Sequence, residues 1–421
     1  MFRQIREGSY SSMDQSPYQT PHIDAFPHPH FKDNYQLENS RWSAGRNALF
    51  FAALISIALC ILGYVQNPER FFQSYLVAFT FTTAIGLGAF FFVMALYLAG
   101  SAAQVTVRRI MENIMVTLPV GAVLFLPLIF GLKYVYPWTH AGVVPGHEVL
   151  KRSYLSENFF SLRAYAYFVL WSIWVLAIYH QSTKQDSRRS AQQMKVIARW
   201  SAPGLFLVVV IGTLAAYDWL MSVQPAWYST IFGLYYLSGG ALAFMSVVTL
   251  VCLGFRRAGI LTNSINIEHY HDLGKWLFAT TCFYTYIAFA QYLLIWYANI
   301  PEETAFYRAR EQGVWLYISL ALPFLRFLIP FFVLLSRPAK RSLTIIGLVA
   351  GYSLVMEFLD LYWVVMPVHY PNGPQIHWLD FATLGATVSI CGLQFWNRFR
   401  KNKMVPVGDL RFQQSLTFEN A

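Results

Sequence analysis

Three acidic residues lie inside long apolar segments of this sequence: Asp218, Glu357 and Asp360. Asp218 and Asp360 each precede a proline by seven residues, at Pro225 and Pro367, and Glu357 lies one helical turn before Asp360. A carboxylate inside a membrane costs about 2.5–3.5 kcal/mol on insertion scales and commonly marks a proton or ion pathway. We therefore expect these three residues to carry protons. The alternative is that each pairs with a neighbouring polar group and only holds helices together.

Three further polar residues share these apolar surroundings. Arg326 needs a buried partner, for which Glu357 and Asp360 are the candidates. If it pairs with one of them permanently, the other remains free to titrate. Tyr284 and Gln291 are seven residues apart, so they share a helical face and could extend a polar path. The alternative for these two is an interhelical hydrogen bond.

The polar stretch before the seventh apolar segment could collect protons at a cytoplasmic entrance. Histidine titrates near neutral pH and would suit this task beside acidic groups. The alternative is a helix start with its aspartate as the N-cap. The candidate residues are Glu268, His269, His271, Asp272 and Lys275.

The composition is that of a membrane protein. Of 421 residues, 56% are hydrophobic and 12% are charged, against about 25% charged in soluble domains. The net charge of +10 does not indicate nucleic-acid binding, because the basic residues lie between apolar segments as membrane insertion requires. The four cysteines form no C-x-x-C pair, which argues against c-type haem attachment and iron–sulfur ligation. With no pair of intramembrane histidines and no nucleotide motif, we expect no cofactor and no metal in this chain.

The sequence predicts an all-α integral membrane protein with ten transmembrane helices of about 20 residues each. We divide it into a polar cytoplasmic tail (1–45), a ten-span membrane domain (46–399) and a cytoplasmic C-terminal tail (400–421). The expected spans are 46–65, 75–99, 113–135, 162–181, 202–222, 229–254, 274–298, 314–335, 343–367 and 378–399.

Charge and spacing predict how these spans are arranged. Lys and Arg are concentrated in the two tails and in the loops after the even-numbered spans, which places both termini in the cytoplasm. The fifth and ninth spans then run in the same direction and share the acid-to-proline spacing. This predicts a parallel repeat, with spans two to five and six to nine as two four-helix bundles and two peripheral helices. Asp218 and Asp360 would lie in the outer half of the membrane, about 10 Å before their prolines.

One region of the chain resembles a known family. The residues are Asp272-Leu-Gly-Lys-Trp-Leu-Phe278, the run from Tyr286-Ile-Ala-Phe-Ala-Gln-Tyr to Ile300-Pro-Glu-Glu-Thr304, and Leu322-Pro-Phe-Leu-Arg-Phe-Leu-Ile-Pro-Phe331. Together with the ten spans, they resemble the NrfD-like membrane subunits of polysulfide-reductase type. Within that family they are most similar to the F subunits of bacterial alternative complex III, a quinol:cytochrome c oxidoreductase.

The resemblance implies a cofactor-free subunit of the bacterial cytoplasmic membrane that is not catalytic alone. Such subunits are labelled quinone-binding by homology and are also proposed to conduct protons, while the homologous C subunit would hold the better-supported quinol site. Menaquinol would be the substrate of the complex, and partner subunits would carry haem c and iron–sulfur clusters. The implied partners are a homologous NrfD-like C subunit, an iron–sulfur B subunit, multihaem and monohaem cytochrome c subunits and small membrane subunits. The resemblance leaves a terminal oxidase open as a further partner.

Two other functions remain open at this stage. The chain could itself house a menaquinol site, for which Asp218 and the outer ends of the bundles are the expected place. It could also be a secondary transporter, since repeats with buried acids suit one. Transporters usually have helices broken in corresponding places, whereas the two prolines here are expected at span exits.

Overall fold

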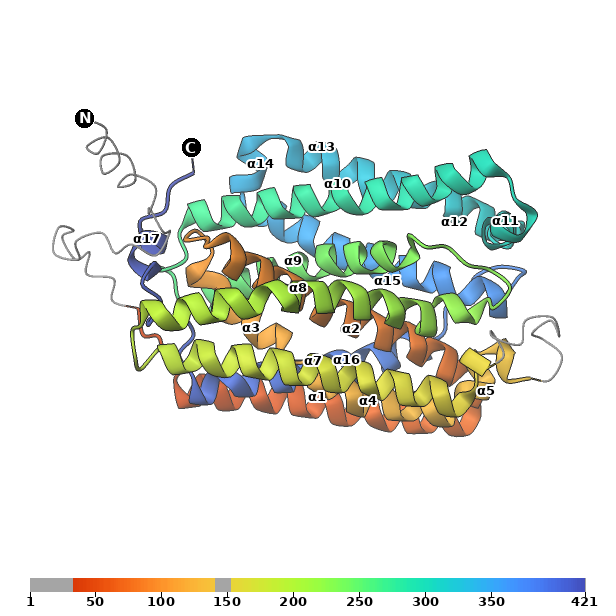
Figure 1. Ribbon diagram of the computed structural model, residues 1–421, viewed down its shortest axis with the longest axis horizontal. Coiled ribbons are helices and arrows are strands. Elements are labelled where there is room, and N and C mark those ends of the chain that lie inside the picture. Colours follow the sequence, from red (N-terminus) through yellow and green to blue (C-terminus); the bar gives the residue numbers. More distant parts are fainter. Residues whose placement is uncertain (1–32, 141–152, 421) are drawn as a thin grey trace, which may run out of the picture.

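The computed structural model describes residues 33–140 and 153–420, which fold into helices without strands. Most of the helices run side by side along the long axis of the molecule (Figure 1). The long helices and their segments are α1 (Asn39–Gln66), α2 (Pro68–Ala99), α3 (Val105–Met115), α4 (Leu118–Phe130), α7 (Glu157–Gln185), α8 (Ala191–Trp219), α9 (Phe232–Arg257), α10 (Ile267–Ala298), α12 (Gly313–Pro323), η4 (Phe324–Leu328), α13 (Ile329–Leu335), α15 (Leu343–His369) and α16 (Trp378–Lys401). The short ones are α5 (Leu132–Val135), η2 (Pro137–Thr139), η3 (Met221–Val223), α11 (Pro301–Arg308), α14 (Arg337–Arg341) and α17 (Phe412–Leu416).

Nine helical crossings in the described part of the chain are long and apolar enough to span a membrane. Three of them are composite: α3 continues into α4, α8 continues into η3, and α12 passes through η4 into α13. The all-helical membrane class predicted from the sequence is therefore confirmed. The tenth expected span, 378–399, is also helical as α16 and packs along α1, but it is not among these nine.

The third crossing begins earlier than the sequence predicted. The expected start was residue 113, yet α3 begins at Val105 and contains Arg108, Arg109 and Glu112. The expected spans 75–99 and 113–135 leave both arginines in the loop between them. That assignment is wrong, because all three side chains are buried and paired with one another and with distant residues.

The centre of the fold is the contact between α2 and α9. Both helices are mostly buried, α2 also packs against α8, and α9 packs against α15 and α10. Gly88 and Gly240 permit the close approach: a Cβ on Gly88 would lie 2.4 Å from the Gly240 carbonyl oxygen. Small residues let helix backbones approach in this way within membranes. The outer helices, such as α1, instead expose large apolar side chains, as a lipid-facing surface requires.

The proline after each buried aspartate behaves differently in the two cases. Pro225 follows η3 outside α8, whereas Pro367 lies inside α15, which continues to His369. The expectation that Pro367 marks the exit is wrong by two residues. Proline removes the bond that its N–H would donate to the carbonyl four residues earlier, here that of Trp363. The Nε of Arg310 donates to that carbonyl oxygen at 3.0 Å and so restores the missing bond.

Candidate functional site

Glu357 and Asp360 of α15 face Arg326 of η4. All three side chains are buried, with no more than 4% of any residue exposed. One guanidinium nitrogen of Arg326 lies 2.9 Å from an Asp360 oxygen, and the other terminal nitrogen pairs with Glu357. Two tyrosine hydroxyls complete the group, which we call the α15 acid cluster: Arg326, Glu357, Asp360, Tyr235 and Tyr284.

The tyrosines bind the Asp360 side of the cluster. The Tyr235 hydroxyl lies 2.6 Å from both Asp360 oxygens, and the Tyr284 hydroxyl donates to one of them at 3.0 Å. The Arg326 guanidinium lies over the Tyr284 ring, 3.6 Å from its centroid. Asp360 is thus held from α9, α10 and η4 at once.

Local backbone features make room for these side chains. Arg326 lies in the π-helical turn η4, directly after Pro323. Such turns insert an extra residue into a helix and often occur at functional sites. On α9, a Cβ at Gly239 would lie 2.7 Å from a Glu357 carboxylate oxygen. The glycine is what allows this carboxylate to fit against α9.

Arg326 contacts both acids, so the condition under which one acid would be left without it is not met. Among the groups in direct contact, two ionised carboxylates facing one guanidinium leave one negative charge in excess. The buried Arg310 donates to the carbonyl oxygens of Phe306, Trp363 and Val364 and makes no ion pair with either carboxylate. Burying an uncompensated charge is costly, and a single added proton would make the cluster neutral. The arrangement is therefore suited to taking up and releasing one proton.

Asp218, the third predicted acid, belongs to a separate ion pair. Arg163 of α7 contacts its two oxygens at 2.9 Å each, and the Tyr167 hydroxyl donates to it at 2.8 Å. Sequence reasoning missed Arg163 as a candidate, although it lies within the expected span 162–181. The sequence did contain a signal. Arg163 is a basic residue on the span before that of Asp218, just as Arg326 lies on the span before that of Asp360. One positive and one negative charge cancel here, which favours the holding role for Asp218.

Replacing Asp218 with Asn is expected to lower the free energy of unfolding by about 3–5 kcal/mol, because Arg163 would remain buried without a counter-charge. The double variant Arg163→Met with Asp218→Asn should regain much of that loss. The midpoint of thermal unfolding of the purified chain measures both effects. Equal stability of Asp218→Asn and the unaltered chain would contradict a structural ion pair.

Tyr284 and Gln291 lie on one face of α10, as expected, and line a common cavity of about 950 Å³. Gln291 donates from its amide to the Tyr307 hydroxyl at 3.3 Å. Arg326 and Asp360 also line this cavity, together with side chains of α12 and η4. The cavity therefore brings together four of the six residues predicted for a proton path: Tyr284, Gln291, Arg326 and Asp360.

The predicted proton-collecting residues lie at the start of α10, at the end of the molecule where residues 402–420 also lie (Figure 1). Glu268 pairs with Arg341 and accepts from Asn420, and Lys275 lies 3.1 Å from Asp272. The alternative that Asp272 is the N-cap is wrong. Asn266 caps α10 instead, accepting hydrogen bonds from the Glu268 and His269 amides.

This group does not contact the α15 acid cluster. His271 Nδ1 lies 3.9 Å from a Glu268 carboxylate oxygen, and His269 Nε2 lies 3.4 Å from the Ser415 hydroxyl. Thirteen residues of helix separate His271 from Tyr284, or about 20 Å. Between them, Thr280 and Thr281 are buried and donate to carbonyls of their own helix.

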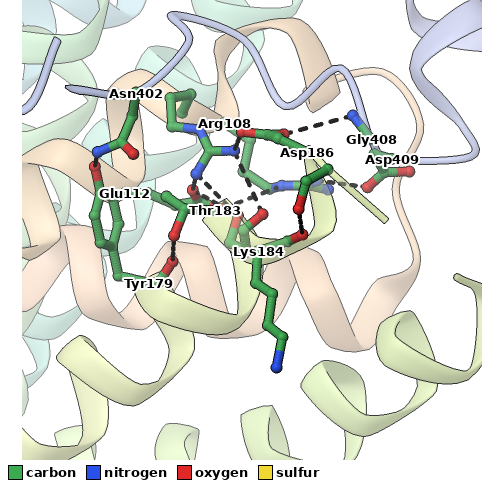
Figure 2. A network of polar contacts seen from close by, with 12 residues as sticks. Arg108, Glu112, Tyr179, Thr183, Lys184, Asp186, Asn402, Gly408 and Asp409 are labelled. Atoms are coloured by element: carbon green, nitrogen blue, oxygen red, sulfur yellow. Dashed lines mark hydrogen bonds and ion pairs between the residues drawn. The ribbon is translucent and has the colours of Figure 1, made fainter. Parts of the chain in front are cut away.

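A buried network at the same end was not predicted as a site (Figure 2). Arg109 of α3 pairs with Glu112 at 3.1 Å and with Asp186 at 2.6 Å. Arg108 lies 3.5 Å from Glu112 and pairs with Asp409 of the C-terminal segment. Partners more than 70 residues away in the sequence leave no local pattern, which is why hydropathy and spacing missed them. The network joins α3, the end of α7 and residues 402–420.

Asp409 fixes the C-terminal segment in this network. Burial opposes ionisation of its carboxyl, but Arg108 and Arg411 outweigh that effect and lower its pKa from 3.8 to about 2. Because the folded pKa lies below the ordinary value, the ionised carboxylate stabilises the fold above about pH 4. That contribution falls away as the pH drops through about 2. A shift of this size corresponds to roughly 2 kcal/mol.

Asp409→Asn is therefore expected to release residues 402–420, because Arg108 loses its charged partner in that segment. Proteolytic cleavage of the segment at pH 7 should be about tenfold faster or more, as a loss of roughly 2 kcal/mol implies. Cleavage of the unaltered chain should stay constant between pH 8 and 5. The control is Glu419→Gln, which changes an exposed carboxylate of the same segment; equal cleavage of both variants would contradict the prediction.

Comparison with known proteins found no match among family models and none among curated proteins. Within residues 33–140 and 153–420, the structure has no group of three or more His, Cys, Asp or Glu side chains placed to hold a metal ion.

Proposed function

We propose that this chain exchanges protons inside the membrane through the α15 acid cluster. The single observation that carries the proposal is one buried guanidinium, Arg326, in contact with two buried carboxylates, Glu357 and Asp360. The cluster differs in this from the balanced pair of Arg163 and Asp218. Its excess charge gives one proton a place to bind.

The proposed path includes the polar groups around the cluster. Tyr284 and Gln291 line the cavity that reaches Asp360, and the hydroxyls of Thr280 and Thr281 lie on the helix that leads to His271. Glu268, His269, Asp272 and Lys275 would receive protons at the cytoplasmic surface. Water molecules would have to bridge the helix between Thr280 and His271.

We propose further that the chain works as a cofactor-free membrane subunit of a respiratory quinol:cytochrome c oxidoreductase. The support is the resemblance of residues 272–331 to NrfD-like subunits. In this setting α16 completes ten spans, α2 to α8 and α9 to α15 form two four-helix bundles, and both termini lie in the bacterial cytoplasm. The contacts of α2 with α8 and of α9 with α15 accord with such bundles. The partners and redox groups would be those that the resemblance implies.

The deciding experiment is mild purification of the tagged chain from its native host. A reduced-minus-oxidised haem spectrum and quinol:cytochrome c activity in the purified material would support the respiratory complex. Isolation of a haem-free chain without partners would overturn that context. Ion-coupled uptake of a solute into liposomes that contain only this chain would then establish the transporter alternative.

A further inference from the structure

The residues proposed to take up protons at the cytoplasmic surface are shielded from water. His269 and His271, near the start of α10, expose 2% and 4% of their surface, and Asp272 exposes 8%. A group that collects protons has to meet water, because water delivers the proton. The proposed entrance is therefore closed in this structure, and some part of the chain must close it.

The C-terminal part of the chain lies over the first turns of α10. The Phe418 ring packs beside the His269 imidazole, with 6.0 Å between the ring centroids. Asn420 donates from its side-chain amide to the Glu268 carbonyl oxygen at 2.8 Å and to a carboxylate oxygen of the same residue at 3.2 Å. The side-chain oxygen of Asn420 accepts from the Lys275 ammonium group. These two side chains therefore contact three of the five residues predicted to collect protons.

The segment before these contacts is firmly attached to the rest of the fold. The Ser415 hydroxyl of α17 accepts from the Thr106 amide at 3.1 Å and donates to the Ala103 carbonyl oxygen at 3.2 Å. Further back, Asp409 pairs with the buried Arg108. Separating a buried ion pair is strongly unfavourable. We therefore take α17 and the residues before it as a fixed base.

The tip beyond α17, residues 417–420, is held more weakly. Thr417 and Glu419 are exposed. Among the described residues, every hydrogen bond from the tip to α10 comes from Asn420. Segments with few buried contacts open locally at a small fraction of the free energy of global unfolding. Two side chains, those of Phe418 and Asn420, thus keep the tip on α10.

Opening the tip would leave no charge at the start of α10 unpaired. Glu268 keeps its ion pair with Arg341 of α14, and Asp272 keeps Lys275 at 3.1 Å. Asn420 is uncharged, so its departure removes hydrogen bonds but no counter-ion. Water can replace those hydrogen bonds, because both sides become exposed together. The open and closed forms therefore differ little enough in free energy to interconvert.

We propose that residues 417–420 form a lid over the start of α10, with α17 as its fixed base. In the closed form, Phe418 and Asn420 keep water from His269 and Glu268. In the open form, His269 and Glu268 meet the cytoplasm and can pass protons toward the membrane. The use of this entrance rests on the proposed function, whereas opening of the lid can be measured without it.

Modification of histidines by diethyl pyrocarbonate tests the lid in the full chain, held in phosphatidylcholine nanodiscs, with mass spectrometry to locate the products. In the unaltered chain, His269 should react far more slowly than His180, which is exposed near the end of α7. Asn420→Ala should raise the rate at His269 about tenfold, as the loss of one side chain's hydrogen bonds implies. Phe418→Ala should act in the same direction, and a chain that ends at Leu416 should give the largest rate.

Gln414 of α17 provides a matched control for Asn420. It carries an exposed amide side chain in the same segment and lies before the lid. Gln414→Ala removes an amide, as Asn420→Ala does, and should leave the rate at His269 unchanged. His180 should react equally in all variants, which controls for the reagent and for the nanodisc.

Three results would overturn the lid. Modification of His269 in the unaltered chain as fast as that of His180 would show that the start of α10 is already open. An unchanged rate in Asn420→Ala and in the shortened chain would show that residues 417–420 do not cover it. An equal rise in Gln414→Ala would assign the effect to a general loosening of the segment.

A rapid pH jump separates the lid from proton exchange. Infrared absorption of the α15 acid cluster should follow the jump about tenfold faster in Asn420→Ala than in the unaltered chain. Faster modification of His269 without faster protonation of the cluster would overturn the lid's role at the entrance and leave proton exchange intact. Absence of protonation in every variant would overturn the proposed function, and the modification rates would still decide whether the lid opens.

Discussion

Replacing Arg326 with methionine is expected to destabilise the protein by about 3–5 kcal/mol, the usual consequence of removing one partner from a buried ion pair. Glu357 and Asp360 would then face each other without a counter-charge, and Tyr284 would lose the guanidinium that lies over its ring. We expect low accumulation of the variant in the membrane and a lower midpoint of thermal unfolding in detergent. Fluorescence of a C-terminal fusion and tryptophan emission would measure the two effects.

A charge-neutral combination separates electrostatics from packing. Arg326→Met, Glu357→Gln and Asp360→Asn together remove all three charges while keeping similar side-chain volumes, and should recover much of the lost stability. The control for removing an arginine is Arg337→Met, because Arg337 is exposed on α14. If the triple variant were as unstable as Arg326→Met alone, the loss would come from packing, and the charge argument would be wrong.

The charged residues inside the apolar segments could be recognised from the sequence, because they depart from the composition usual for membrane spans. Charged residues are rare in membrane spans, so Asp218, Glu357, Asp360 and Arg326 stand out, and the pairing of Arg326 with acids on the next span followed from the need for a partner. The spacing of Tyr284 and Gln291 likewise predicted a shared face, which the common cavity confirms. These inferences concern residues on one helix or on neighbouring spans.

Other features depend on tertiary contacts that leave no local signal. Hydropathy assigns Arg108 and Arg109 to a loop because it takes no account of ion pairs. Their partners, Asp409 and Asp186, lie in distant segments of the sequence. The cavity between α10 and α12 is lined in part by a π-helical turn, and short-range patterns do not specify such a turn. The helix start at Asn266 was missed because an aspartate further along the chain seemed the better cap.

Proton exchange at the α15 acid cluster leads to a prediction in which function and stability change in opposite senses. Either Asp360→Asn or Glu357→Gln leaves one carboxylate for Arg326, which converts an unbalanced cluster into a neutral pair. The place for the extra proton is then lost. We expect roughly hundredfold slower proton transfer, the low end of what a positioned acid or base contributes, with stability equal to or above that of the unaltered chain.

Infrared difference spectra of the purified chain, recorded during a pH titration, test this directly. Beyond the bands of the exposed carboxylates, which all variants share, one carboxyl band that changes with pH should be present in the unaltered chain and absent from both single variants. Asp218→Asn is the control, because its balanced pair with Arg163 should leave the band in place while lowering stability. A band that survives in Asp360→Asn and Glu357→Gln but disappears in Asp218→Asn would transfer the proton-binding role to Asp218. In that case Arg326 would hold both of its acids permanently ionised, and the α15 acid cluster would only hold its helices together.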